Sequence, residues 1–218
     1  MRTILLATSN SHKLQEIQAV IAESHATLTT LDGIGLQIDE PVEDQLTFEG
    51  NAALKAQYYA NASKHLCMAD DSGLEVDALN GAPGVISARY SGTTGERGVV
   101  DLANNTKLLR ELADTPAEKR TARFVCAMAL CEPNGSEPIC VVRGTIEGRI
   151  LGPGDLGYAI DNPKGRGNNG FGYDPLFLVP ALDKTTAELS PDGKNKISHR
   201  GQAARKMWQQ VQHHILNS

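Results

Sequence analysis

Short apolar runs alternate with segments of helical character along most of the chain, and this alternation restricts the fold more than any other feature. The runs at 4–7 and 66–69 are short and bounded by polar residues, which is typical of buried strands. The segment 47–62 is rich in alanine, and 198–216 carries an apolar stripe at helical spacing, so both are predicted helices. Interleaved strands and helices predict an α/β protein with a mixed sheet.

The other elements are predicted in the same way. A helix is expected after residues 8–11, because Leu14, Ile17 and Ile21 recur near helical spacing. Further expectations are loop and strand at 31–40, a helix at 99–112, hairpin strands at 123–131 and 139–150, a loop at 152–172, a strand at 175–179 and a turn at 190–195.

Composition argues against several classes of protein. The chain has 218 residues, which suits one domain, and its net charge is −5. An acidic chain without a basic stripe is not expected to bind nucleic acid. The four cysteines lack the spacing of zinc ligands. No apolar run approaches the ~18 residues of a membrane span, and the N-terminus is not a signal peptide, so we expect a cytoplasmic protein without a membrane partner.

The first polar segment is a candidate phosphate site. It lies where the first strand is expected to lead into the first helix, and a helix N-terminus offers unpaired N–H groups and partial positive charge. Hydroxyl and amide side chains add donors, and a lysine adds a full charge. The alternative is an ordinary helix cap, and the glycines of a Walker A loop are absent. The residues are Thr8, Ser9, Asn10, Ser11, His12 and Lys13.

Two adjacent acids, Asp70 and Asp71, follow the predicted strand 66–69. Adjacent side chains of a strand point to opposite faces, so one acid can bind a cation while the other acts elsewhere. Mg²⁺ uses few carboxylates and keeps waters and phosphate oxygens as its other ligands. Glu40 is our candidate for a further carboxylate at the metal. The alternative is a solvated loop tip.

Two later segments are candidates for contacts to a base. Phe171 and Tyr173, separated by one glycine, can present their rings to a flat ligand, and Asp174 can accept hydrogen bonds from ring N–H groups. The alternative is a tight turn with core aromatics. The segment 194–200 leads into the last predicted helix, with Ser198 as its cap. Its Lys194, His199 and Arg200 also form a donor cluster suited to purine oxygens or a phosphate.

Together these segments resemble the inosine/xanthosine triphosphate pyrophosphatase family, the Ham-type enzymes that remove non-canonical purine nucleotides. The similarity extends from Leu5 to about Met207. The motifs are Ala7-Thr8-Ser9-Asn10-x-x-Lys13-x-x-Glu16, Thr47-Phe48-x-Gly50-Asn51-Ala52-x-x-Lys55-Ala56, Ala69-Asp70-Asp71-Ser72-Gly73-Leu74-x-Val76-Asp77-Ala78-Leu79, Gly84-Val85-x-Ser87-Ala88-Arg89-Tyr90, Gly170-Phe171-Gly172-Tyr173-Asp174-Pro175 and Lys194-Asn195-x-Ile197-Ser198-His199-Arg200.

The resemblance implies a long curved mixed sheet with flanking helices and two lobes that enclose a substrate cleft. It implies one domain over residues 1–218, a homodimer and a Mg²⁺ requirement. The reaction it implies is hydrolysis of ITP, dITP or XTP to the monophosphate and pyrophosphate.

The resemblance also implies residue roles. Residues 8–13 and Lys55 would hold the phosphates, and Ser72 would contact the substrate. Asp71 would be the proton acceptor, lying at the metal with Glu40 and Asp70. Phe171 and Tyr173 would flank the base. The other contacts to nucleotide and base edge would come from Gly172, Asp174, Lys194, His199 and Arg200.

Selectivity is expected to depend on the oxygen at position 6 of hypoxanthine and xanthine. Donors from His199 or Arg200 would pair with it and would face the amino group of adenine without an acceptor. The loop 151–169 is longer than the family pattern and is expected to affect cleft access or dimer contacts. Two other functions stay open: a nucleotide-binding sensor without catalysis, and a phosphatase acting on ordinary nucleotides on the same scaffold.

Overall fold

The computed structural model describes residues 3–8, 10–21, 27–156, 160 and 163–217 of the chain. Within these residues lies a sheet of seven strands in the order β2-β1-β3-β4-β5-β6-β7. β1 pairs in parallel with β2 and β3, whereas β6 pairs antiparallel with β5 and β7. The prediction of an α/β protein with a mixed sheet and flanking helices is confirmed.

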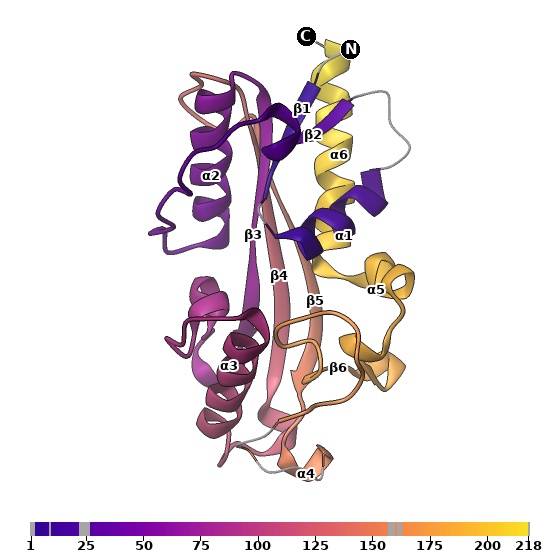
Figure 1. Ribbon diagram of the computed structural model, residues 1–218. Coiled ribbons are helices and arrows are strands. Elements are labelled where there is room, and N and C mark those ends of the chain that lie inside the picture. Colours follow the sequence, from indigo (N-terminus) through magenta and orange to yellow (C-terminus); the bar gives the residue numbers. More distant parts are fainter. Residues whose placement is uncertain (1–2, 9, 22–26, 157–159, 161–162, 218) are drawn as a thin grey trace. The chain divides into compact units, whose positions relative to one another are not determined.

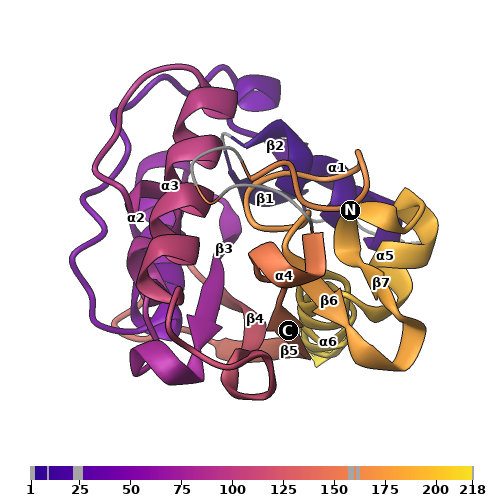
Figure 2. The same cartoon turned by 90° about the horizontal axis from the view of Figure 1, so that it is seen from below.

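The elements can be followed by their labels in Figure 1, and β7 is labelled in Figure 2. The strands are β1 (Thr3–Ala7), β2 (Thr27–Thr30), β3 (Leu66–Val76), β4 (Thr121–Cys131), β5 (Cys140–Ile150), β6 (Phe177–Val179) and β7 (Lys184–Thr185). The helices are α1 (Ser11–Ile21), α2 (Phe48–Ser63), α3 (Arg97–Glu111), α4 (Pro153–Leu156), α5 (Pro191–Ile197) and α6 (His199–Asn217).

Several elements differ from the prediction, among them the helix α4, which lies in the expected loop 152–172, and the strand β7, which was not expected. The strand expected within 31–40 is wrong, because β2 lies earlier and a 3₁₀ turn at Asp32–Ile34 follows it. The turn expected at 190–195 is instead the helix α5, which starts with Pro191, a residue well suited to a first helical position. β3 does not end before the acids but continues through them to Val76.

The chain divides into two compact units. Unit 1 comprises Met1–Ser72, Cys126–Thr145 and Ile197–Ser218, and unit 2 comprises Gly73–Val125 and Ile146–Lys196. In unit 1, α2 covers one face of the strands, and α1 and α6 cover the other (Figures 1 and 2). Among the described residues, no helix is both long and apolar enough to cross a membrane.

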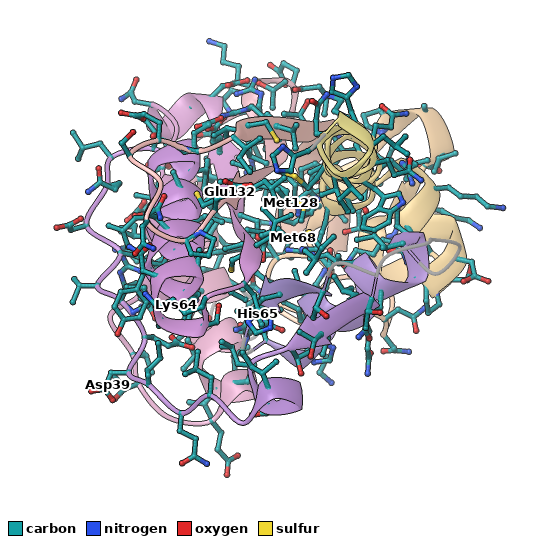
Figure 3. All side chains as sticks on the ribbon, turned by 90° about the horizontal axis from the view of Figure 1, so that it is seen from above. Asp39, Lys64, His65, Met68, Met128 and Glu132 are labelled. Atoms are coloured by element: carbon teal, nitrogen blue, oxygen red, sulfur yellow. The ribbon has the colours of Figure 1, made fainter. Side chains whose placement is uncertain are left out.

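The core of unit 1 forms where α1 and α6 bury their apolar stripes against the sheet. Ala204, Met207 and Val211 of α6 are fully buried, as the helical spacing predicted. Met68 on β3 and Met128 on β4, labelled in Figure 3, belong to the same core. Burial of these stripes, rather than helix propensity, therefore fixes α6 on the sheet.

The core of unit 2 is assembled from strand ends and α3. The rings of Phe124 on β4 and Phe177 on β6 lie 4.3 Å apart between centroids. Leu108 and Leu109 of α3 and Leu74 of β3 are buried as well. α3 therefore packs into the core of unit 2 through these leucines.

Gly144 on β5 marks a close approach between this strand and the start of α6. A Cβ at this position would overlap the carbonyl oxygen of His199 and would lie 2.7 Å from the backbone nitrogen of Ala203. We expect Gly144→Ala to lower the free energy of unfolding by about 1–3 kcal/mol, as overpacking commonly does. Urea denaturation measures this.

The matched control is Gly98→Ala in α3, where an added Cβ meets no atom within 4 Å. This variant should be neutral or stabilised by up to about 1 kcal/mol, because alanine is the better helix former. Equal stability of the two alanine variants would contradict the packing argument.

Candidate active site

Asp70 and Asp71 lie inside β3 and point to opposite faces of the sheet. Oδ2 of Asp70 lies 2.9 Å from Nζ of Lys13 on α1. On the other face, Oδ2 of Asp71 accepts a hydrogen bond of 3.1 Å from Nδ2 of Asn51 on α2, and its Oδ1 lies 3.8 Å from Nζ of Lys55. The prediction that adjacent acids face opposite sides is confirmed. The acids can lie within the strand because cations on both faces compensate them.

Asp70 is buried but remains charged. Burial alone would raise its pKa, but the charges of Lys13, Arg200 and Lys55 outweigh burial and lower the pKa to about 2 from 3.8. Oδ2 of Asp70 contacts Lys13, whereas Oδ1 is buried without a hydrogen-bond partner among the described residues. A buried anionic oxygen in this state is suited to a cation.

Asp71 has the opposite shift. Burial raises its pKa above the ordinary value, and Lys55 and Lys13 oppose this only in part, while the charge of Glu43 adds to the increase. The backbone N–H of Ser72 donates to Oδ1 over 2.9 Å. Asp71 is thus a fixed carboxylate with a higher proton affinity than an exposed aspartate.

Glu43 is the further acid that the structure brings to this site. Its Oε1 lies 2.7 Å from Nζ of Lys55, the lysine that also approaches Asp71. Glu40, which the sequence favoured, is exposed. Burial raises the pKa of Tyr59 to about 12, and the charge of Glu40 adds to this increase. Both acids belong to the same irregular segment, so sequence spacing gave no means of choosing between them.

Asn51 is a site residue that sequence reasoning did not single out. It is fully buried in α2 and donates to Asp71, while its Oδ1 accepts the backbone N–H of Gln45 over 3.0 Å. Asn51 thereby ties Asp71 to the segment that carries Glu43. An asparagine within the predicted helix 47–62 is the signal that could have identified it, because asparagine is unfavourable inside helices.

The segment before α1 caps that helix with its own side chain. Oδ1 of Asn10 accepts the N–H groups of His12 (3.0 Å) and Lys13 (3.3 Å), and Oγ1 of Thr8 accepts the N–H of Asn10 (3.2 Å). These two N–H groups, which we expected to bind phosphate, therefore donate to the side chain of Asn10 instead. The side chain of His12 is exposed. Outside the described part of the chain lie Ser9 and the side chain of Ser11.

Arg200, in the first turn of α6, has partners different from those expected. Its guanidinium is paired with Glu16, donates to Oγ of Ser72 over 2.8 Å, and places Nε 3.8 Å from Oδ2 of Asp70. Only 3% of its side chain is exposed. Arg200 therefore lies with the acids of unit 1, next to His199, which is also buried. Its contact with a base edge stays a prediction.

In unit 2, the loop around Phe171 is held by Asp174. Oδ2 of Asp174 accepts the backbone N–H of Phe171 (2.8 Å) and Nζ of Lys194 (2.7 Å), and Oδ1 accepts the hydroxyl of Thr186 (2.7 Å). Nζ of Lys194 and the guanidinium of Arg97 lie 5.3 and 5.1 Å from the centroid of the Phe171 ring. Phe171, Asp174 and Lys194 are thus brought together as predicted.

Tyr173 does not offer an open ring. It is buried, its hydroxyl donates to the carbonyl of Ser87 over 2.8 Å, and burial raises its pKa. The glycines beside Phe171 have positive φ, +79° at Gly170 and +61° at Gly172, which favours glycine. A Cβ at Gly170 would also overlap the carboxylate of Asp174. Tyr173 is thus a core aromatic, as the alternative proposed, whereas base stacking by the half-buried Phe171 stays a prediction.

The acids of unit 1 fit a magnesium ion that uses few protein ligands. In the part of the chain that the structure describes, no group of three or more histidine, cysteine, aspartate or glutamate side chains is arranged to hold a metal alone. Mg²⁺ typically takes one or two carboxylates together with waters and substrate phosphates. Oδ1 of Asp70, which has no hydrogen-bond partner among the described residues, or Asp71 on the other face of the strand, can supply one such carboxylate.

Known proteins are similar to this chain in sequence over nearly its whole length. The dITP/XTP pyrophosphatase of Exiguobacterium sibiricum is 47% identical over 207 residues, covering 94% of each chain. The dITP/XTP pyrophosphatase of Nitratidesulfovibrio vulgaris is 46% identical over 208 residues, covering 94% of this chain and 93% of its own.

Solved structures agree with the sequence matches. A HAM1 protein from Coxiella burnetii has a TM-score of 0.82 and 36% identity, covering 98% of this chain and 100% of its own. The nucleoside-triphosphatase / dITP/XTP pyrophosphatase from Mycobacterium abscessus has a TM-score of 0.71 and 41% identity, covering 94% and 98%. The family model described as "Ham1 family" matches residues 4–210. A match of this extent, with the acids, lysines and aromatic loop in place, means that the chain belongs to the Ham1 family.

Proposed function

We propose that this protein is a Mg²⁺-dependent pyrophosphatase that hydrolyses ITP, dITP and XTP to the monophosphate and pyrophosphate, and so removes non-canonical purine nucleotides. The observation that carries the proposal is the pair Asp70 and Asp71 on β3, each facing a lysine, Lys13 or Lys55. Relatives named dITP/XTP pyrophosphatase at 46% and 47% identity support the substrate class.

Asp71 together with Glu43, which approaches the same Lys55, or Asp70 on the other face of β3, would supply the one or two carboxylates of the metal site, and Glu40 stays a prediction. When bound there, Mg²⁺ supplies positive charge to the phosphate oxygens. Lys13 and Lys55 add positive charge from the two faces of β3. Phosphoryl chemistry needs mainly positioning and charge stabilisation, which this arrangement provides.

Asp71 is assigned the role of general base. Its carboxylate takes a proton from a water molecule whose oxygen forms a bond to the α-phosphorus. The bond from the α-phosphorus to the bridging oxygen breaks, and pyrophosphate leaves with that electron pair. A raised pKa suits this role, because a base works best when its pKa lies nearer to the operating pH.

The substrate-binding residues expected from the sequence stay proposals. Those assigned to the phosphates are Thr8, Ser9, Asn10, Ser11, His12, Lys13, Lys55 and Ser72. For the base, the ring of Phe171 is assigned as a stacking surface, with Asp174 and Lys194 at its edge and Gly172 alongside. Tyr173 acts through the loop rather than by direct contact.

Selectivity for hypoxanthine and xanthine over adenine requires a donor facing the oxygen at position 6. His199 and Arg200 are the two candidates from the sequence, and in this structure Arg200 is engaged with Glu16 and Ser72. Lys194 is a third donor, held close to Phe171 by Asp174. Adenine would leave such a donor without an acceptor, which costs binding.

The deciding experiment measures pyrophosphate and orthophosphate release from ITP, XTP, GTP and ATP, with Mg²⁺ and with EDTA. We expect pyrophosphate from ITP and XTP, little product from GTP or ATP, and none in EDTA. Orthophosphate would indicate a phosphatase, and equal rates on all four substrates would contradict the selectivity. Binding of ITP without turnover would indicate a sensor.

Two further expectations rest on the family resemblance. We propose that the protein is a homodimer and that it acts in the cytoplasm on the free nucleotide pool. Light scattering on the purified protein gives the mass in solution, and a monomer mass at micromolar concentration would contradict the dimer.

A further inference from the structure

One face of helix α3 lies against the loop that carries Phe171. Arg97, Asp101 and Asn105 are spaced by four residues, so they share a face of α3. All three contact the segment 171–172 within unit 2. None of them belongs to the chemistry assigned above.

Asp101 and Asn105 hold Gly172 from its two ends. Oδ2 of Asp101 accepts the N–H of Gly172 over 2.8 Å, and Nδ2 of Asn105 donates to the carbonyl of Gly172 over 3.0 Å. Gly172 has φ of +61°. Its N–H belongs to the peptide shared with Phe171 and its carbonyl to the peptide shared with Tyr173, so α3 fixes the direction of both aromatic side chains.

Arg97 extends this control to the ring itself. Its Nε lies 2.9 Å from Oδ1 of Asp101, and its guanidinium carbon lies 5.1 Å from the centroid of the Phe171 ring, within the range of a cation–π contact. Lys194 approaches the same ring and is itself paired with Asp174. Two carboxylate–cation pairs therefore fix one ring, and each carboxylate also binds the loop backbone.

We propose that α3 positions the base-stacking surface: Asp101 and Asn105 hold the loop, and Arg97 holds the Phe171 ring in the orientation that a purine needs. The inference deepens the proposed function and rests on it. A ring that is already ordered loses less conformational freedom when a base stacks on it, so binding is tighter. These are positioning residues, and their loss should weaken contact to the base but not to the phosphates.

The test compares two ligands by titration calorimetry in Mg²⁺: IMP, which has a base, and inorganic tripolyphosphate, which has none. For Arg97→Gln we expect the Kd of IMP to rise about three- to tenfold, the value of a partly desolvated cation–π contact. Asp101→Leu should raise it about tenfold or more, because the N–H of Gly172 loses its acceptor. Asp101→Asn, which keeps an acceptor, should lie between wild type and Asp101→Leu.

The control is Arg110→Gln, an exposed arginine on the same helix, which should match wild type. For tripolyphosphate, every variant should keep the wild-type Kd. In turnover of ITP, the effect should appear in KM, with kcat nearly unchanged.

Two results would overturn the inference. One is an unchanged Kd of IMP in both Arg97→Gln and Asp101→Leu. The other is equal weakening of IMP and tripolyphosphate, which indicates a general loss of structure. If wild type hydrolyses ITP and binds IMP while the variants behave alike, only the inference fails. If wild type neither binds IMP nor hydrolyses ITP, the proposed function fails first.

Discussion

Replacing Asp71 by asparagine is expected to lower kcat for ITP by about 10²–10⁴-fold, the typical contribution of a positioned general base. Asparagine keeps the shape of the side chain and its place beside Asn51, but it cannot accept a proton. Binding should change far less than turnover, because Lys13 and Lys55 remain. Steady-state kinetics and calorimetry with a non-hydrolysable ITP analogue measure the two quantities separately.

The matched control is Asp39→Asn. Asp39 belongs to the same unit, is exposed, and is labelled at the edge of the view in Figure 3. Near-normal turnover in Asp71→Asn would rule out this residue as the base. Recovery of turnover at high Mg²⁺ would instead show that Asp71 acts mainly by holding the metal.

Replacing Arg200 by methionine is expected to lower the free energy of unfolding by about 3–5 kcal/mol, the cost of removing one partner of a buried ion pair. The variant leaves Glu16 and Asp70 without their shared cation, and the side chain of Asp70 is only 1% exposed. At roughly 2–4 °C per kcal/mol for a chain of this size, the melting temperature should fall by about 10 °C. Calorimetry without nucleotide measures this.

Arg205→Met serves as the control, because Arg205 is an exposed residue of the same helix and such substitutions usually change stability by at most about 0.5 kcal/mol. The double variant Glu16→Met with Arg200→Met should be more stable than Arg200→Met alone, since one unpaired carboxylate is removed as well. An unchanged melting temperature in Arg200→Met would contradict the buried network. A loss of activity confined to ITP, with ATP unaffected, would support Arg200 as a base reader.

Local sequence patterns predicted much of the architecture. Apolar runs and stripes were sufficient for the α/β class, for α2 and for α6, because burial of one face fixes such elements. The family resemblance is confirmed by the match over residues 4–210. The opposite directions of Asp70 and Asp71 followed from strand geometry alone.

Long-range contacts explain what the sequence did not reveal. The end of β3 was misplaced because two acids in succession indicate a loop unless cations from α1, α2 and α6 compensate them. The choice between Glu40 and Glu43 depends on how an irregular segment folds back on Lys55. The role of α3 could not be predicted, because Asp101 meets Gly172 across 71 residues of chain.

The side chains of β3 point alternately to the two faces of the sheet, and this alternation limits which insertions and deletions the strand can tolerate. If one codon were lost or gained between Leu66 and Asp70, every later residue of the strand would turn to the other face. Asp70 would then meet the lysine of α2, and Asp71 the lysine and arginine on the opposite side, so all the acids and bases would survive in the wrong order. The length of this short run therefore matters to the site as much as the acids themselves, although none of its apolar side chains is assigned a contact with the nucleotide.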